Sequence, residues 1–355
     1  MRVPPGKREL IATLEASGQN PWVYEGDEGT SLVVLPYGGR ILGLYENASD
    51  ENFLWTNEAL DQVESAKAYF PSEVWKNSGG DRTWLGPEVE FFYPNYPDCT
   101  TYFQQRSLDP GNYQPTCSSP KQFTLENKLQ LRAAWTRHDW HLRMTKTVSP
   151  TPNPLREISQ SEPEGVRYAG YRLHTALVIE GNSPPESHIN LWNLLQLPGG
   201  GEMIVPTYFR TQPTTFFGDI SPENLCTEDH VVRYQMGDPG LQKISVKAAA
   251  LTGRAGYVRT HGDHWNLVIR NFAVDPSEGY FDRWPTQMDD FGYAFQACNI
   301  NTPDFGQFSE LEYHAPAIGG ATQRTRSDDV SQVWAYRGNK QGIRELARLL
   351  LNTTI

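Results

Sequence analysis

The sequence predicts an all-β fold: a large antiparallel β-sandwich with helices only at its periphery. Three observations predict it. Many short apolar or alternating segments are bounded by Gly, Pro and Asn. Few helical patterns lie between them, which is unlike the βαβ units of a parallel sheet. The 355 residues include 30 Gly and 26 Pro, a turn-rich and globular composition.

The N-terminal part is expected to form a helical lead-in and then a hairpin. Residues 1–20 contain a segment, 7–16, that places Leu10, Ile11 and Leu14 on one helical face. Two apolar runs follow within 31–45, separated by Pro36 and a glycine pair. This arrangement is typical of two strands joined by a tight turn.

The middle of the chain reads as a succession of strands. Residues 121–135 and 139–148 alternate with a period of two, which predicts half-buried strands. Similar runs follow, so that we expect roughly fourteen strands or more. These runs cover residues 169–181, 187–198, 202–209, 230–236, 243–251, 264–274, 292–300, 308–316 and 331–338.

The C-terminus predicts a helix that covers a sheet, over residues 339–352. Ile343, Leu346, Ala347 and Leu350 follow the spacing i, i+3, i+4 and i+7. The Pro/Ser/Glu-rich segment 149–165 is the best candidate for a domain boundary. Strands of the same kind flank it, so we expect a surface excursion within one domain over residues 1–355.

Charge and cysteine content exclude several classes of protein. A net charge of −11 argues against nucleic-acid and anionic-membrane partners. No apolar run is long enough for a membrane-spanning helix, and no signal peptide is visible, which leaves a cytoplasmic and a secreted or periplasmic location both open. The four cysteines are too sparse for a disulfide scaffold; Cys99 and Cys117 flank one loop, and their pairing stays open. We expect a monomer or a homodimer.

Residues 77–92 form the first candidate site, a glycine-rich stretch that carries Asp81, Arg82, Trp84 and Glu88. Adjacent glycines allow the backbone to turn sharply and to approach a ligand. Arg82 offers fixed donors to hydroxyls or carboxylates, and Trp84 offers a flat apolar face. This combination suits a sugar. The alternative is a structural turn stabilised by Asp81 and Arg82.

Two further segments carry histidines. If residues 187–198 are extended, His188, Asn190 and Trp192 share a face, although a lone histidine is more often structural than catalytic. Residues 259–272 contain Asp263 and His264 in an H-x-x-H pattern, which is a weak indication of a metal because further ligands would be needed. Asp263 is a candidate acceptor for sugar hydroxyls.

The fourth candidate is the segment 308–320, which contains Glu310, Glu312 and His314 at every second position. A strand points all three to one face, whereas Leu311 and Tyr313 point to the other. Burial and a neighbouring carboxylate both raise the pKa of a carboxyl group toward that of a general base. In the alternative, both glutamates are structural: one forms a salt bridge with an arginine, and the other lies at the edge of the sheet.

Taken in order, Arg82, His188, Asp263 and Glu312 resemble the site motifs of the galactose-mutarotase-like (aldose 1-epimerase) superfamily, and the chain looks like a remote, uncharacterised branch of it. The segment 311–317 matches the form L-E-x-x-x-P-x-A. The "HINLWNL" segment departs from the pattern: the family histidine falls on Ile189, one position from His188, and such a shift reverses the face.

The resemblance implies a β-supersandwich that binds a small-molecule or oligosaccharide substrate, without a cofactor or metal. It implies a catalytic group made of Glu312 as base, His188 or His314 as acid, or His264 in their place. The substrate-binding residues would be Arg82, Asp81, Trp84, Glu88, Trp192, Asp263, His264 and Glu310. We expect Glu310 to be nearer the strand entry and water. The alternatives are a carbohydrate lyase or glycoside-processing enzyme, metal-assisted in one version, and a non-catalytic sugar-binding protein.

Overall fold

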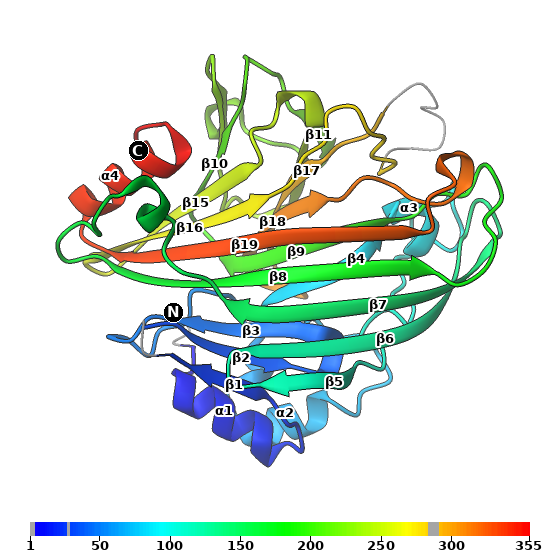
Figure 1. Cartoon of the computed structure of the whole chain (residues 1–355), viewed down its shortest axis with the longest axis horizontal. Coiled ribbons are helices and arrows are strands. Elements are labelled where there is room, and N and C mark those ends of the chain that lie inside the picture. Colours follow the sequence, from blue (N-terminus) through cyan, green and yellow to red (C-terminus); the bar gives the residue numbers. More distant parts are fainter. Residues whose placement is uncertain (1–3, 27–28, 283–290) are drawn as a thin grey trace.

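Two large antiparallel β-sheets pack against each other (Figure 1) in the computed structural model, which describes residues 4–26, 29–282 and 291–355. The nine-stranded sheet contains, in spatial order, β1 (Trp22–Glu25), β2 (Ser31–Leu35), β3 (Arg40–Tyr45), β4 (Asp81–Gly86), β9 (Asn190–Pro198), β18 (Gly306–His314), β17 (Phe295–Thr302), β14 (Gly240–Val246) and β11 (Thr214–Phe217). The ten-stranded sheet contains β12 (Leu225–Thr227), β13 (Val231–Gln235), β10 (Glu202–Pro206), β15 (Arg254–His261), β16 (His264–Phe272), β19 (Arg326–Gly338), β8 (Arg167–Ile179), β7 (Asp139–Pro150), β6 (Gln122–Arg132) and β5 (Gln114–Ser119).

The predicted all-β sandwich is confirmed, and so are the strands with the clearest patterns. The hairpin expected within 31–45 is the antiparallel pair β2–β3. The alternating segments 121–135 and 139–148 contain β6 and β7, which pair along their length. Residues 149–165 connect β7 to β8, and these two strands pair with each other. The segment is therefore an excursion from one sheet.

The strand β4 lies where the sequence suggested a glycine-rich loop. Gly79 and Gly80 both adopt positive φ angles, of 93° and 76°. A Cβ atom on Gly80 would lie 2.2 Å from the carbonyl oxygen of Ile41, so only glycine fits this close approach to β3. The glycines thus build the turn, and the residues after it run as a strand between β3 and β9.

Both predicted helices are present, as α1 (Lys7–Ala16) and α4 (Lys340–Leu351). Leu10 and Leu14 of α1 pack with residues of β2 and β3. Ile343 and Leu346 of α4 pack in the same way on the ten-stranded sheet. Two further helices were not predicted: α2 (Val63–Tyr69), beside α1, and the short α3 (Glu88–Phe91) (Figure 1).

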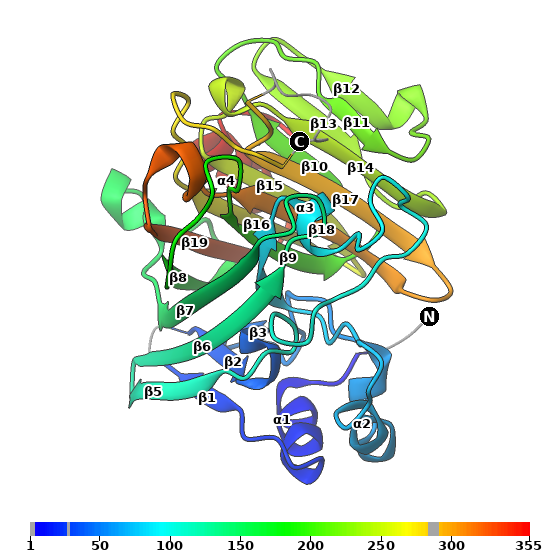
Figure 2. The same ribbon diagram turned by 90° about the vertical axis from the view of Figure 1, so that its right-hand side faces the viewer.

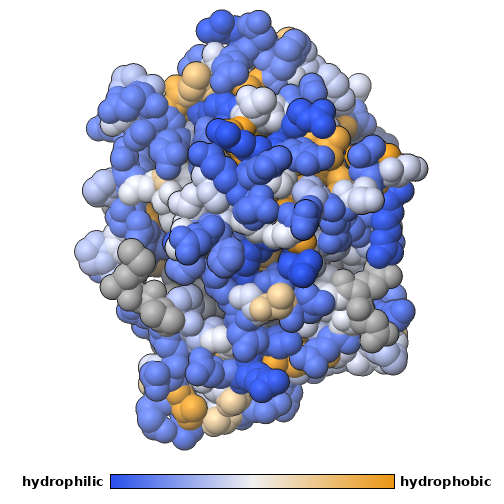
Figure 3. All heavy atoms as spheres, turned by 90° about the vertical axis from the view of Figure 1, so that its left-hand side faces the viewer, coloured by the Kyte–Doolittle hydropathy of each residue, from blue (hydrophilic) through white to orange (hydrophobic). Residues whose placement is uncertain are grey.

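Figure 3 shows that the face carrying α4 is mostly hydrophilic, with small scattered apolar patches. Within the described ranges, no helix has the length and apolar character needed to cross a bilayer. Cys99 and Cys117, whose pairing was left open, are both free and exposed.

Candidate active site

The strand β18 places three titratable side chains on the side of the nine-stranded sheet that faces away from the ten-stranded sheet. Glu310, Glu312 and His314 lie opposite Gln196, Leu194 and Trp192 of β9. Directly paired residues share a face of an antiparallel sheet. Tyr313 points the other way and stacks on Phe272 of β16 at 4.7 Å. The predicted alternation of this segment is therefore confirmed.

Side chains from three other elements, and Asp282 from a loop, join Glu310 and Glu312 on the same face. We call this group the charged cluster; none of its members is more than 8% exposed. It consists of Arg82 of β4, Glu88 of α3, Lys243 of β14, Asp282, and Glu310 and Glu312 of β18. Burying so many charges is costly unless each is paired or hydrogen-bonded. The pairing within the cluster thus determines its chemistry.

Glu312 is, with Asp282, the most deeply buried carboxylate of the cluster, at 1% exposure. It accepts a hydrogen bond from the indole Nε1 of Trp192 at 2.8 Å and lies 3.1 Å from the Nζ of Lys243. Burial raises the pKa of Glu312 to about 8, against the opposing effect of the Lys243 ammonium. A carboxyl group with such a pKa can both accept and release a proton near neutral pH.

Lys243 connects two carboxylates. Its Nζ lies 3.2 Å from Glu88 and 3.1 Å from Glu312, and 4.6 Å from the centroid of the Trp192 ring. Burial alone lowers the pKa of Lys243, but Glu312 and Glu88 outweigh it and hold the pKa well above its usual value. The side chain is therefore an ammonium ion at neutral pH.

Glu310 forms a separate pair with Arg82. The Arg82 Nη2 lies 3.1 Å from Glu310, and Gln196 donates a second hydrogen bond to the same oxygen at 2.8 Å. The guanidinium lies over Trp84, 3.8 Å from a ring centroid, and donates to Asn77 at 2.9 Å. Glu310 is 5% exposed against 1% for Glu312, which is the expected order, although both carboxylates are buried.

His314 lies beside Glu312 but both of its ring nitrogens are occupied. Nδ1 lies 2.9 Å from the Asn190 amide nitrogen, which is a donor, and Nε2 lies 2.9 Å from the Gln296 amide oxygen, which is an acceptor. This assigns the proton to Nε2. Burial and the Lys243 ammonium hold the pKa of His314 well below its usual value. The imidazole is neutral, and its contacts are those of a structural residue.

Asp81, predicted to bind substrate, points to the opposite face of the sheet. Adjacent residues of a strand alternate, so β4 directs Arg82 to the charged cluster and Asp81 into the space between the sheets. There Asp81 forms a bidentate ion pair with Arg270 of β16, with distances of 2.5 and 3.0 Å, and accepts a hydrogen bond from Tyr171. Its role is structural.

Three other predicted residues are not members of the charged cluster. His188 precedes the first residue of β9 and stacks on Phe281, with 4.1 Å between ring centroids. Asp263 and His264 are exposed at the hairpin turn between β15 and β16, in the other sheet. The H-x-x-H spacing therefore reflects a tight turn. The structure does bring together Arg82, Trp84, Glu88, Trp192, Glu310, Glu312 and His314.

Trp84 and Trp192 are buried, so they do not offer an exposed flat face to a ligand. Trp84 is 3% exposed and Trp192 is 1% exposed. They lie under the guanidinium of Arg82 and the ammonium of Lys243, respectively, where cation–π contacts stabilise the buried charges. Two other aromatic residues contact the charged cluster and are partly exposed. The Tyr102 hydroxyl donates to Glu88 at 3.0 Å, and Lys243 lies 5.7 Å from the ring centroid of half-buried Phe216. Figure 2 shows the side of the molecule that carries α3, the helix of Glu88.

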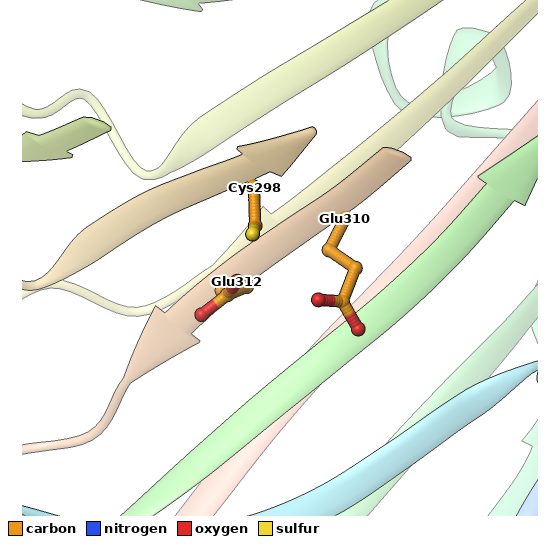
Figure 4. A group of neighbouring side chains, drawn as sticks. All are labelled: Cys298, Glu310 and Glu312. Carbon is orange, nitrogen blue, oxygen red and sulfur yellow. The ribbon is translucent and has the colours of Figure 1, made fainter. Parts of the chain in front are cut away.

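Three side chains of this site lie close enough together to contact one metal ion. Cys298, Glu310 and Glu312 have ligand atoms within 4.8 Å of one another (Figure 4). However, each carboxylate already pairs with a cation, and burial with nearby carboxylates holds the pKa of Cys298 well above its usual value. A cysteine ligand binds a metal as the thiolate. A divalent ion at this point would therefore release the thiol proton and compete with Arg82 and Lys243 for the two carboxylates.

One protein-family model matches the sequence over most of its length. The model of the family described as "Family of unknown function (DUF6786)" matches residues 11–355. No curated protein matches the chain in sequence.

Three solved structures illustrate the similarity. A galactose mutarotase-like protein from Lactobacillus casei is 11% identical, with a TM-score of 0.47, over 90% of this chain and 99% of that one. A galactose 1-epimerase from Lactobacillus acidophilus is 10% identical, with a TM-score of 0.43, over 90% and 95%. An aldose epimerase homologue from C. elegans is 7% identical, with a TM-score of 0.43, over 91% and 100%. The chemistry of this chain has to be argued from its own residues.

Proposed function

The chain belongs to the DUF6786 family, and from its charged cluster we propose that it is a carbohydrate-active enzyme that uses acid–base chemistry at the anomeric centre of a sugar. In the proposed reaction, Glu312 takes the proton of the anomeric hydroxyl, the bond between the anomeric carbon and the ring oxygen breaks, and the ring oxygen is protonated. Rotation of the carbonyl and closure of the ring give the other anomer. The enzyme would be an isomerase of the aldose 1-epimerase type.

One observation carries the proposal: the environment of Glu312. A carboxylate buried to this degree, with one indole donor and one ammonium as its polar partners, has a pKa near 8. Titratable groups with strongly shifted pKa values, held by specific partners, are typical of catalytic sites. A purely structural salt bridge would not need an acceptor whose proton affinity is so close to neutrality.

The choice of a sugar rests on two supports. The first is the motif order Arg82…Glu312, which the sequence shares with the galactose-mutarotase-like superfamily. The second is the partly exposed aromatic residues Tyr102 and Phe216, which contact Glu88 and Lys243, because sugar rings stack readily on such side chains. A non-catalytic sugar-binding protein would instead use exposed tryptophans, and both Trp84 and Trp192 are buried. A lyase would use Arg82 or a metal to stabilise an anion, and Arg82 is already paired with Glu310.

Anomer conversion by the purified protein tests the proposal. Freshly dissolved α-anomers of common aldoses, and of their 6-phosphates and short oligosaccharides, would be followed by polarimetry with and without the protein. We expect at least one to be converted faster than the spontaneous rate. Glu312→Gln keeps the shape of the side chain but cannot accept a proton, so we expect kcat to fall about 100-fold or more with KM little changed.

A second buried glutamate supplies the matched control. Glu46 is 3% exposed and pairs with Arg337 at 3.2 Å, far from the charged cluster in sequence and partners. Glu46→Gln removes the same charge from a similar environment and is expected to leave kcat within about twofold, because it touches no catalytic group. Equal losses in both variants, or full activity of Glu312→Gln, would contradict the role of Glu312.

A further inference from the structure

The proposed reaction needs a proton donor for the ring oxygen, and no histidine supplies it. The ring of His188 stacks on Phe281 with 4.1 Å between centroids, and His314 uses both ring nitrogens. We infer that Lys243 is the proton donor: its ammonium protonates the ring oxygen while Glu312 deprotonates the anomeric hydroxyl. This inference rests on the proposed function and assigns the second half of its chemistry to a residue that the sequence did not indicate.

The position of Lys243 supports the inference first. Its Nζ and the Oε2 of Glu312 are 3.1 Å apart. A base and an acid acting on the hydroxyl and ring oxygens of one anomeric carbon must lie close together, because these two oxygens are bonded to the same atom. Among the described residues of the cluster, the other cation is Arg82, which is paired with Glu310 and, as a guanidinium, does not give up a proton.

The hydrogen bonds of Lys243 leave it a proton to give. An ammonium carries three N–H donors. Glu312 and Glu88 accept two of them, at 3.1 and 3.2 Å, and the face of Trp192 lies on a further side, with 4.6 Å to the ring centroid. A substrate oxygen that accepts the third N–H would therefore replace the contact with the Trp192 ring and not a carboxylate.

Glu88 acts as a positioning residue for Lys243. Its backbone N–H donates to Asp282 at 2.8 Å, and its carboxylate accepts from Tyr102 at 3.0 Å. Asp282 in turn accepts from Gln296 at 2.8 Å, and Gln296 is the partner of His314. These contacts fix the carboxylate that holds the lysine side chain in place. The same contacts give hydrogen-bond partners to Glu88, Asp282 and Gln296, which are buried near the Lys243 ammonium.

The proton transfers balance. In ring opening, Glu312 gains the hydroxyl proton, the oxygen left behind forms the carbonyl double bond, and the electron pair of the broken bond goes to the ring oxygen. That oxygen takes a proton from Lys243, which becomes an amine. In ring closure, the lysine amine takes this proton back, the oxygen attacks the carbonyl carbon, and Glu312 returns its proton to the new hydroxyl. Neither an oxidant nor a cofactor is consumed.

Chemical rescue of a lysine deletion tests the inference. Lys243→Ala is expected to lose about 100-fold or more in kcat, with KM changed by less than about threefold, as for loss of a proton donor. Methylammonium or ethylammonium ions fit the space vacated by the side chain and should restore part of the rate. The rescued rate should depend on the pKa of the added amine. Tetramethylammonium, which has charge but no proton, should restore nothing.

Matched variants complete the test. Lys247 lies four residues along the chain, 4.1 Å from the ring centroid of Tyr293, and Lys247→Ala removes the same charge outside the charged cluster. It should keep kcat within about twofold. If Lys243→Ala does not fold, as judged by circular dichroism, Lys243→Met, which keeps the volume of the stem, replaces it for the measurement of kcat and KM, and the same loss in kcat is expected.

The outcomes separate the inference from the proposed function. Full activity of the Lys243 variant, or equal rescue by tetramethylammonium, would overturn the inference and leave the role of Glu312 standing. Failure of the wild-type protein to convert any sugar would overturn the proposed function and the inference with it. Rescue by proton-bearing amines alone supports both.

Discussion

Glu312 shows how opposing physical effects set the property of one residue. Removal from water favours the neutral carboxylic acid, whereas the Lys243 ammonium 3.1 Å away favours the carboxylate. Burial is the stronger effect, and the pKa rises to about 8. At neutral pH most of the Glu312 carboxyl groups are therefore protonated, and the ionised fraction that can act as the base grows as the pH rises toward 8. The same shift has a consequence for the stability of the protein, independent of any substrate.

The pH dependence of unfolding should reveal this shifted group. The folded pKa of Glu312, about 8, lies above the unfolded value of 4.5, so the folded state binds more protons between these values. The stability contributed by the bound proton is fully present below pH 4.5 and is lost as the pH rises through 8. We expect the free energy of unfolding of the wild type, from urea denaturation, to decrease between pH 7 and pH 9, and that of Glu312→Gln to decrease less. His314, whose pKa is lowered, affects stability only below about pH 6.5 and stays out of this window. Parallel curves for the two proteins would show that Glu312 ionises normally.

Sequence reasoning found some of these residues and not others, for local reasons. The alternation of β18 sufficed to place Glu310, Glu312 and His314 together. Lys243 precedes Ile244 and alternates with apolar residues, which is also the pattern of a lysine that faces solvent. Only the register of β14 against β17 places it opposite Cys298, on the face of Glu312. No local signal in the sequence distinguishes these two cases.

At the scale of elements, β4 shows how a strand divides two adjacent charged residues. Its path from the Gly79–Gly80 turn directs Arg82 outward to Glu310 and Asp81 inward to Arg270. The sequence alone cannot show which of two neighbours faces a site, because the answer depends on which face of the sheet is covered. The same argument applies to His188, which lies before the first residue of β9, so strand alternation does not place its side chain.

A pair of aspartate substitutions tests this division. Asp81→Asn leaves Arg270 buried without a full counter-charge, and breaking a buried ion pair typically costs about 3–5 kcal/mol. Asp263→Asn, at the exposed turn between β15 and β16, should change stability by less than about 0.5 kcal/mol. Chemical denaturation of the two variants against the wild type measures both values. A large loss in Asp263→Asn together with no loss in Asp81→Asn would reverse the assignment.

At the scale of the whole molecule, the site depends on strands from distant parts of the chain. Side chains of β4, β9, β14, β17 and β18 meet on one face of the nine-stranded sheet, and β4 pairs with β9, which pairs with β18. The sequence predicted the two-sheet class because alternation and turns are local features. It could not predict strand order, which is fixed by contacts between residues far apart. The single domain over residues 1–355 stays a prediction, and strands of both halves of the chain contribute to each sheet.

The central claim is that the charged cluster is where a sugar reacts, and a crystal of the protein soaked with mixed monosaccharides and divalent metal ions tests it most directly. We expect a sugar whose anomeric hydroxyl lies within hydrogen-bond distance of the Glu312 carboxylate and whose ring oxygen lies within hydrogen-bond distance of the Lys243 Nζ. A sugar bound instead at Asp263 and His264, or a metal ion held by Cys298, Glu310 and Glu312, would contradict it.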